Sequence, residues 1–432
     1  MIGFLIKRNP LHAVTNRRKP SSTPLSASWH RIGYGKPRTR SAQQRTRGLL
    51  MNTAAFKIAN KLLTGQGAVE QLALELSRLN ITNPLIVTDA ILIKSGTVEH
   101  VLKQLGERRY GIYDGVEPEP EIAIVEACAK VYRDGGHDGL IGVGGGSAID
   151  IAKAVAGYVG HDGALEELFG VDQIKRKGPP LIAIPTTAGT GSEVTNVSIL
   201  SDKQAQLKKG IVSDYLLPDV ALVSPLMTLT CPRGVTAASG VDALVHAVES
   251  YLSVNASPIT DALAIGAIKL IAKALPKAYA NPADLLARED MATASLMAGM
   301  AFGNAGVGAV HALAYPLGGR FNIAHGVSNA LLLPYVMAWN KLACVERMAE
   351  IAAALGVQTH GLSDKAAADL AVEAMAELCA SVDIPKGMRS FGVPEDAIPA
   401  MAEEASKIDR LMRNNPRRLT AGDIEQIYRA AY

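Results

Sequence analysis

Strand-like segments occupy only the first half of this chain, and helical segments alone make up the second half. The strand-like runs cover residues 84–89, 140–147, 180–187 and 219–225, and each ends at turn residues. Amphipathic helical patterns lie between them, as at 95–105 and 121–135. Alternating strands and helices indicate a mostly parallel sheet that is covered on both faces.

From about residue 231 the strand signal stops. Alanine-rich segments with helical periodicity follow at 237–253, 259–280, 290–302, 345–356 and 365–382. At 432 residues the chain is long enough for two domains with separate cores. The sequence therefore predicts a disordered extension over 1–50, an α/β dinucleotide-binding domain over 51–230 and an all-α metal-binding domain over 231–432.

The composition is that of a soluble globular protein, with 48% apolar and 20% charged residues. A membrane-spanning helix needs about 18 or more consecutive apolar residues. The longest candidate run, within 259–280, is interrupted by Lys269 and Lys273. No membrane association is predicted.

The first fifty residues differ from the rest in charge. They hold three Lys and eight Arg and no acid, so the net charge of +3 divides into +11 for residues 1–50 and −8 for residues 51–432. Such a segment without apolar periodicity predicts disorder. True initiation at Met51 is the favoured interpretation, and an organelle transit peptide, a basic tail or a cloning remnant are the alternatives. The acidic remainder gives no electrostatic reason to expect nucleic-acid binding.

Cysteine usage points to a reducing compartment. The four cysteines are scattered and form no C-x-x-C pair, which is typical of reduced core thiols rather than a disulfide framework. We therefore expect a cytoplasmic protein, with an organelle as the minor alternative that the basic extension leaves open. The cysteines are Cys128, Cys231, Cys344 and Cys379.

A glycine-rich turn follows the second predicted strand. The sequence LIGVGGGSAIDIAKAVA, at 140–156, indicates a buried strand, a turn and a helix. Glycines at such a turn let backbone N–H groups approach a phosphate at the positive end of the helix dipole. The match to G-x-G-x-x-G is imperfect, because Gly142 and Gly144 fit while Ser147 stands at the last glycine position. Taken alone, a simple tight connection explains the turn equally well.

Two further features fit a nucleotide site. The strand at 180–187 leads into AGTGSEVT, whose hydroxyls and glycines offer donors to phosphate and ribose. Asp89 ends the strand at 84–89, where a carboxylate can accept bonds from the adenosine ribose and repel a 2′-phosphate, favouring NAD over NADP. An ordinary turn or N-cap aspartate is the alternative interpretation of Asp89.

One carboxylate and three imidazoles form a candidate metal site. Asp242 and His246 are four residues apart in a predicted helix, so they project from one face. His311 would come from a second helix, and His325 from the loop or helix start after Pro316. This donor set suits Zn²⁺ or Fe²⁺ better than Mg²⁺ or Ca²⁺. From spacing alone, polar groups at helix-packing seams explain these residues equally well.

Four stretches together resemble the iron-containing (group III) alcohol dehydrogenase family. They are GGGSAIDIAKA, PTTAGTGSEVT, GVDALVHAVESYLS and AHGVSNALLLPYVMAWN, in the family's order, and the resemblance covers residues from about 54 to the C-terminus. It implies an N-terminal α/β dinucleotide-binding domain and an all-α C-terminal domain, with the active site in the cleft between them. It also implies a homo-oligomer, by analogy.

The resemblance assigns roles to particular residues. The implied ligands of a divalent metal, Fe²⁺ or alternatively Zn²⁺, are Asp242, His246, His311 and His325. The implied NAD-binding positions are Asp89, Gly145, Gly146, Ser147, Asp150, Thr187, Thr190 and Lys208. Lys209 is an alternative to Lys208, and either lysine is also compatible with a solvated turn. Phe302 corresponds to a pocket residue of relatives, or equally to a core aromatic.

One position departs from the family pattern. Many relatives have a further His four residues after the third ligand, implicated in proton relay, and Tyr315 stands there in this chain. Phenols ordinarily titrate near 10, which makes them poorer bases at neutral pH. Tyr315 is therefore an uncertain relay position, and water, the cofactor ribose or another residue are the alternatives.

The sequence thus predicts a metal-dependent oxidoreductase that transfers a hydride reversibly between a small alcohol and NAD. The product is an aldehyde or a ketone. Two other interpretations stay open, an enzyme like glycerol dehydrogenase or dehydroquinate synthase, and a non-catalytic metal-binding scaffold. A scaffold would leave the glycine turn and Asp89 without a purpose.

Overall fold

A computed structural model describes residues 53–202 and 207–432. The predicted disorder of residues 1–50 and the favoured start at Met51 lie outside the described residues. Residues 54–432 pack together as one unit, so the predicted domain boundaries remain a prediction. Among the described residues no single helix is long and apolar enough to cross a membrane, although one sharply bent pair of helices passes on length and composition.

A six-stranded, fully parallel sheet organises the first half of the chain. Its strands lie in the order β1-β9-β6-β4-β2-β3. The four predicted strands form its middle positions: β9 (Val220–Val223), β6 (Leu181–Pro185), β4 (Gly139–Gly144) and β2 (Pro84–Val87). The short edge strands β1 (Leu62–Thr64) and β3 (Gly111–Tyr113) complete it. The middle strands are buried throughout, as expected of a parallel sheet covered on both faces.

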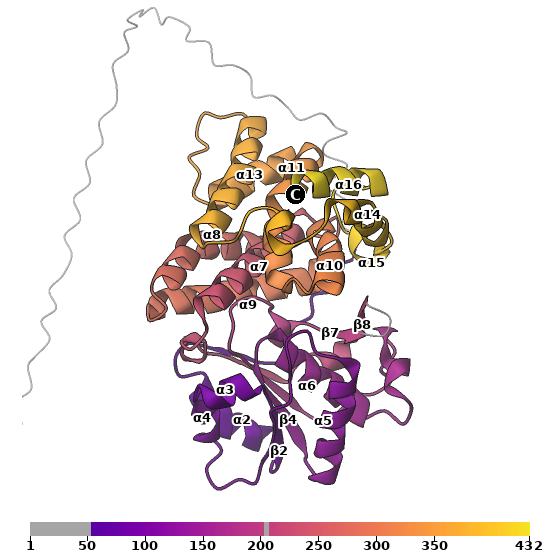
Figure 1. The fold of residues 1–432 in the computed structure, drawn as a ribbon. Helices are drawn as coiled ribbons and strands as arrows, with labels where there is room; N and C mark the ends of the chain where they lie inside the picture. The colour runs from indigo at the N-terminus through magenta and orange to yellow at the C-terminus, as the bar shows by residue number, and fades with distance from the viewer. Residues whose placement is uncertain (1–52, 203–206) are drawn as a thin grey trace, which may run out of the picture. The chain divides into compact units, whose positions relative to one another are not determined.

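Helices cover both faces of this sheet (Figure 1). On one face, α5 (Ile122–Asp134) and α6 (Gly146–Val159) pack on Leu85, Val87 and Leu140. On the other face, α2 (Leu72–Arg78), α3 (Ala90–Lys94) and α4 (Glu99–Leu102) pack on the side containing Ile86 and Ile141. The alternation of side chains along each strand supplies both apolar faces.

A second, smaller sheet was not predicted. It contains β5 (Gly170–Val171), β7 (Val197–Asp202) and β8 (Leu207–Val212) in the order β5-β8-β7, and β7 pairs antiparallel with β8. The sequences VSILSD and LKKGIV mix apolar and polar residues without strict alternation, so a search for apolar runs does not find them. This sheet carries Lys208.

The second half of the described chain is helical, and the predicted fold class is confirmed. Its α-helices are α7 (Arg233–Leu252), α8 (Pro258–Ala280), α9 (Leu285–Ala305), α10 (Ala309–Phe321), α11 (His325–Asn340), α12 (Val345–Ala354), α13 (Asp364–Ser381), α14 (Ile398–Ser406), α15 (Asp409–Met412) and α16 (Ala421–Ala430). Short 3₁₀ helices occur in both halves. Those of the first half are η1 (Val69–Gln71), η2 (Leu165–Leu168), η3 (Ser192–Val194), η4 (Asp214–Leu216) and η5 (Pro225–Thr228), and those of the second half are η6 (Lys341–Ala343), η7 (Met388–Phe391) and η8 (Glu395–Ala397).

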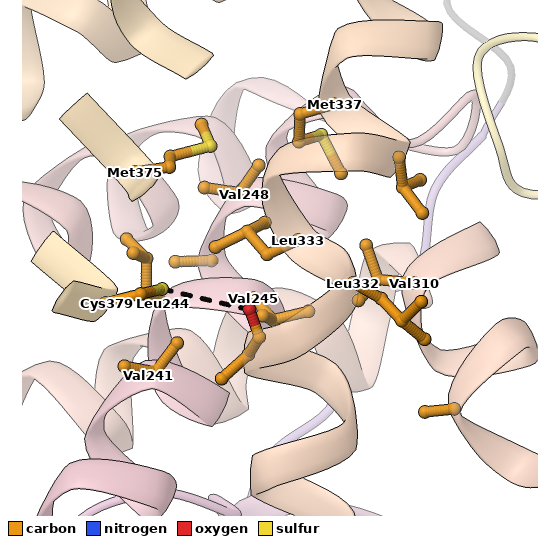
Figure 2. Close-up of a cluster of buried hydrophobic side chains, with 14 of the residues drawn as sticks. Val241, Leu244, Val245, Val248, Val310, Leu332, Leu333, Met337, Met375 and Cys379 are labelled. Carbon is orange, nitrogen blue, oxygen red and sulfur yellow. Dashed lines mark hydrogen bonds between the residues drawn. The ribbon is translucent and has the colours of Figure 1, made fainter. Parts of the chain in front are cut away.

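Helix α7 lies at the centre of this half and is buried along almost all its length. Val241, Leu244, Val245 and Val248 recur at the spacing of one helical face and pack against side chains of α10, α11 and α13 (Figure 2). A second face of the same helix is therefore held at a constant orientation. That second face carries the candidate metal ligands.

Candidate active site

Three helices supply the four candidate metal ligands. Asp242 and His246 lie one turn apart on α7, His311 lies in the first turn of α10, and His325 is the first residue of α11. Asp242, His246 and His311 are buried, and His325 is partly buried. Of the two placements that the sequence left open for His325, a loop or a helix start after Pro316, the structure shows the helix start.

The structure brings these side chains together. Ligand atoms of Asp242, His311 and His325 all lie within 4.8 Å of one another. The ring of His246 stacks on that of His311, with ring centroids 4.7 Å apart. The ring of Phe302 also stacks on that of His246, with centroids 4.2 Å apart. His246 is adjacent to the three-residue group but outside it. Phe302 is part of this site rather than a remote core aromatic.

Burial sets the protonation of this cluster. It lowers the pKa of His246 to about 4 and that of His325 to about 3, so both imidazoles are neutral at ordinary pH. Burial also opposes ionisation of Asp242. This burial effect is smaller than the electrostatic attraction between the carboxylate and the neighbouring His246, His325 and His311 together with the hydrogen bond from Asn329. The pKa of Asp242 therefore lies below its usual range. Neutral imidazoles and an ionised carboxylate are the forms that bind a metal ion.

A buried ring nitrogen that lacks a hydrogen-bond partner in the described part of the chain indicates that the cluster fits a divalent ion. Nε2 of His311 is buried and has no hydrogen-bond partner among the described residues. It lies 4.0 Å from Oδ1 of Asp242. Leaving a buried polar nitrogen unpaired costs about 1–3 kcal/mol, which a ligand bond would offset. Three imidazoles and one carboxylate suit Fe²⁺ or Zn²⁺.

Asn329 belongs to this cluster and was not predicted. Its side-chain NH₂ lies 2.6 Å from Oδ1 of Asp242 and 3.2 Å from Nε2 of His325. Asn329 stands one turn after His325 on α11 and is fully buried. The i, i+4 spacing from His325 was the available signal, but an Asn inside an apolar helix has many structural uses.

The glycine turn forms a second part of the site. Strand β4 ends at Gly144, whose φ of +155° is a conformation that favours glycine, and α6 begins at Gly146. A Cβ on Gly146 would lie 2.8 Å from Cγ2 of Thr190, and one on Gly145 would lie 3.5 Å from Thr187. The turn therefore brings together Gly145, Gly146, Thr187 and Thr190, and leaves the N-terminal N–H groups of a 14-residue helix accessible to an anion.

Asp89 lies beside this turn but does not line the cavity described below. Its Oδ1 accepts a 2.9 Å hydrogen bond from the Leu92 N–H, which makes it the N-cap of α3. The N-cap interpretation is thus observed. Its Oδ2 lies 3.9 Å from where a Cβ of Gly144 would stand, and within the described part of the chain this oxygen is left for another partner.

Asp150 is engaged within the protein. Its carboxylate accepts hydrogen bonds from the Ser192 hydroxyl and from the Ile199 N–H at 2.8 Å, which tie α6 to η3 and β7. Burial raises the pKa of Asp150, although the nearby Lys153 opposes the shift. Asp150 and Ser147 both line the cavity from α6. The hydrogen bonds of Asp150 also hold its neighbours Ser192 and Ile199 in the wall.

Lys153 and Glu193 are buried ionisable side chains that were also missed, and Nζ of Lys153 lies 3.7 Å from Oδ1 of Asp150. The Nζ of Lys153 donates to the Ser192 hydroxyl at 2.7 Å, to the Thr195 hydroxyl at 3.0 Å and to the Val197 carbonyl at 2.9 Å. Burial lowers the pKa of Lys153 to about 8 and raises that of Glu193 to about 7. No spacing rule signals a buried lysine whose hydrogen-bond partners are about 40 residues away.

Lys208 and Lys209 point to different surroundings. Lys208 lines the cavity and forms an ion pair with Glu119. Lys209 pairs with Asp202 at 2.7 Å and lies 5.5 Å from the ring centroid of Phe169. Of the two lysines left open by the sequence, Lys208 is the one that faces the site.

One cavity of about 460 Å³ joins these parts. Its wall combines groups from the sheet half with groups from the helical half: Gly146, Ser147, Asp150, Thr190 and Lys208 with Asp242, His246, Phe302, His311, Tyr315, His325 and Arg410. Tyr315 lies with its ring centroid 6.4 Å from that of His325, and its hydroxyl oxygen accepts a hydrogen bond from Arg410 at 3.3 Å. A ligand in this cavity can touch the glycine turn and the metal cluster together.

Comparison with protein families accounts for nearly all the described chain. A model described as iron-containing alcohol dehydrogenase matches residues 59–225, and a model of the C-terminal part of that family matches residues 236–432. Both parts of the cavity wall thus fall within the matched ranges.

Curated proteins and a solved structure of similar sequence agree with this family match. Long-chain-alcohol dehydrogenase 1 of Geobacillus thermodenitrificans is 48% identical over 373 residues, which is 85% of this chain and 94% of that protein. NAD-dependent methanol dehydrogenase of Bacillus methanolicus is 39% identical, covering 87% of this chain and 99% of that protein. A crystal structure of 1,3-propanediol oxidoreductase superposes with a TM-score of 0.86 at 40% identity, over 88% of this chain and all of that one.

Proposed function

The chain belongs to the iron-containing alcohol dehydrogenase family, and on that premise we propose that its cavity transfers a hydride reversibly between a small alcohol and NAD. Membership makes the protein an oxidoreductase of alcohols and aldehydes, with NAD and a divalent metal as its cofactors. The observation that carries the proposal is the convergence of Asp242 and three imidazoles on a cavity that also contains the glycine turn.

We assign Asp242, His246, His311 and His325 to the metal. When bound, a divalent ion supplies Lewis acidity, which lowers the pKa of an alcohol and polarises a carbonyl, typically worth several kcal/mol. The carboxylate and the neutral imidazoles hold the ion, and the buried surroundings of Asp242, His246 and His311 exclude competing water. Phe302, stacked on His246, restricts how that ring can turn.

We assign the sheet half to the cofactor. The N–H groups at the start of α6, around Gly145, Gly146 and Ser147, suit the pyrophosphate. The hydroxyls of Thr187 and Thr190 lie beside them as further donors. Lys208 lines the same cavity as this turn and the metal cluster, where a cation suits the cofactor ribose.

Asp89 and Asp150 support the same assignment in different ways. The free oxygen of Asp89 beside Gly144 suits the adenosine ribose and favours NAD over NADP. Asp150 is proposed to act by holding Ser192 and Ile199 in the cavity wall.

Tyr315 remains our candidate for proton transfer. Because Arg410 donates to its hydroxyl oxygen, the phenolic hydrogen is left to donate toward the cavity. A hydroxyl in that position can pass a proton between a bound alcohol and solvent near Arg410, which is exposed.

The substrate class follows from the remaining wall. Val197, Ile199, Val212, Phe302 and Leu411 line the cavity between its polar groups. An aliphatic chain fits such a wall. Relatives named for long-chain alcohols, 1,3-propanediol and methanol support an aliphatic primary alcohol of variable length. They do not support the glycerol-dehydrogenase-like or scaffold alternatives.

Turnover with a panel of alcohols and aldehydes tests the proposal. The metal-stripped protein is reloaded with Fe²⁺ or Zn²⁺, and formation or loss of NADH is followed by its near-ultraviolet absorbance. We expect NAD-linked turnover that requires added metal. Turnover that persists in rigorously metal-free protein, or none with any alcohol in the loaded protein, contradicts it.

We also propose a cytoplasmic homo-oligomer that binds neither nucleic acid nor membrane. The four cysteines are all free and buried, which suits a reducing compartment. The acidic balance of residues 51–432 argues against a nucleic-acid partner. Size-exclusion chromatography with light scattering tests the oligomer, and fractionation of cells tests the location.

A further inference from the structure

Glu249 is a buried carboxylate on the helix that also carries Asp242 and His246. It lies seven residues after Asp242, two turns along α7, and is 3% exposed. Two turns of a helix return a side chain to nearly the same face. A buried acid costs free energy unless donors surround it, so its partners indicate what it is there to hold.

The first partner is the ring of His311. Oε2 of Glu249 lies 2.6 Å from Nδ1 of His311. A carboxylate only accepts hydrogen bonds, so Nδ1 must carry the hydrogen and Nε2 is left with its lone pair. Nε2 is the same buried nitrogen that has no hydrogen-bond partner among the described residues and that lies 4.0 Å from Asp242.

The other partners are backbone groups at the start of α10. The Gly308 N–H donates to Oε2 at 3.0 Å, and the Val310 N–H donates to Oε1 at 2.6 Å. These N–H groups belong to the positive end of the helix whose first turn contains His311. A Cβ on Gly308 would lie 3.3 Å from Oε1 and 3.0 Å from the Asn415 side-chain oxygen, so glycine permits this close approach.

We propose that Glu249 is the positioning residue that makes His311 a metal ligand, by holding both its ring and the backbone of its helix. The inference rests on the proposed metal site. Helix α7 then carries two proposed metal ligands, Asp242 and His246, and also Glu249, which positions a third ligand. Carboxylates that bond a ligating imidazole orient it and raise its basicity, and their loss typically weakens metal affinity about 10–100-fold.

The test is metal affinity in Glu249→Gln, measured by chelator competition with Zn²⁺ and with Fe²⁺ on the full-length, metal-stripped protein. The amide keeps the size of the side chain, but it replaces an acceptor oxygen with an NH₂ that faces donors. We expect binding about 10–100-fold weaker than in the wild type. We also expect altered Co²⁺ absorption bands in the cobalt-loaded protein and substantial recovery of turnover at saturating metal.

Glu75→Gln is the matched control. Glu75 is also a fully buried carboxylate, but it pairs with Lys61 and Arg78 in the sheet half. Its loss should lower the unfolding temperature without changing metal affinity. Should Glu249→Gln fail to fold, Glu249→Asp keeps the charge on a shorter side chain that cannot reach all three donors, and it should show the same loss of affinity.

The outcomes separate the two proposals. Wild-type protein that binds no divalent metal overturns the proposed function itself. Wild-type protein that binds metal, with a Glu249 variant that binds it as tightly and with an unchanged Co²⁺ spectrum, overturns only the role of Glu249. An equal loss of affinity in Glu75→Gln also overturns it, because the effect would then follow general stability.

Discussion

The two halves of the chain build their sides of one cavity in opposite ways. The sheet half offers the backbone of the contiguous turn at Gly144–Gly146, against which Thr187 and Thr190 lie so closely that a Cβ would meet them. The helical half offers side chains from α7, α10 and α11, which are separated by up to 83 residues of sequence between Asp242 and His325. A backbone site is therefore sensitive to added atoms, whereas a side-chain site is sensitive to removed ones.

The largest effect should come from removing an atom in the helical half. His311→Ala should abolish metal retention and lower turnover by about 10³-fold or more, since Lewis-acid stabilisation is worth several kcal/mol and each 1.36 kcal/mol is about tenfold. The fold should persist, because α10 remains buried against the core. Metal content, turnover and circular dichroism measure these effects.

His360→Ala is the control, since His360 is exposed and distant in the sequence from the cluster. Normal turnover by a metal-free His311→Ala protein would remove the basis for the side-chain site.

In the sheet half, an added atom should weaken the binding of NAD. Gly146→Ala places a Cβ 2.8 Å from Cγ2 of Thr190. Overpacking of this kind typically costs about 1–3 kcal/mol, so we expect KM for NAD to rise about 10–100-fold while metal affinity stays unchanged. Thr190→Ser, which removes Cγ2 and keeps the hydroxyl, should restore much of the loss in the double variant.

Gly234→Ala serves as the comparison, because a Cβ there meets nothing within 4 Å. If Gly146→Ala binds NAD as the wild type does, the turn is a mere connection, and the contrast between the halves fails.

The buried charges behind the sheet-half wall should give a pH signature. Burial raises the pKa of Glu193 to about 7 from an ordinary value of 4.5. The folded protein therefore holds the proton more tightly than the unfolded chain, and the contribution of Glu193 to stability is present below pH 4.5 and lost as pH rises to about 7. Glu193→Gln should gain on the order of 1–3 kcal/mol relative to the wild type across that window.

Urea denaturation of both proteins at several pH values between 4.5 and 8 measures the difference. A constant difference across the range would mean that Glu193 does not titrate there.

The smallest expected effect separates two roles of one aspartate. Asp89→Asn keeps an N-capping oxygen for the Leu92 N–H but removes the charge, so stability should change by only a few tenths of a kcal/mol. Discrimination against NADP should fall by about tenfold, because the 2′-phosphate no longer meets a carboxylate. The ratio of kcat/KM values for the two cofactors measures it, and an unchanged ratio would leave Asp89 as a cap alone.

The sequence predicted the centre of the fold better than its edges. The four predicted strands occupy the middle of the large sheet because their burial on both faces demands unbroken apolar runs. Strands β1 and β3 have three residues each, too few to show a period, and β7 and β8 mix apolar and polar residues without strict alternation. The sequence predicted α7, α8 and α9 correctly because they span 20, 23 and 21 residues, which is long enough to show helical periodicity.

The residues of the site also divide into those with a local sequence signal and those without one. The residue types and spacing indicated Asp242, His246, His311 and His325 as a candidate metal site and Asp89 as a candidate ribose partner, and the family resemblance assigned the metal-ligand and the further cofactor-binding roles. Glu249, Asn329 and Lys153 escaped notice. Each of them takes its meaning from partners on other elements, and in the sequence each is one charged or amide residue inside an ordinary helix.

Local pattern alone determined the four middle strands of the large sheet, the long helices, the glycine turn after β4, and the change from α/β to all-α structure near residue 230. Tertiary packing alone decided that Nε2 of His311 lies toward Asp242 and that Lys208 rather than Lys209 lines the cavity. It also decided that the carboxylate of Asp150 accepts hydrogen bonds from Ser192 and Ile199. Periodicity and backbone conformation depend on neighbours along the chain. Tautomers, pKa values and convergence depend on groups that only folding makes adjacent.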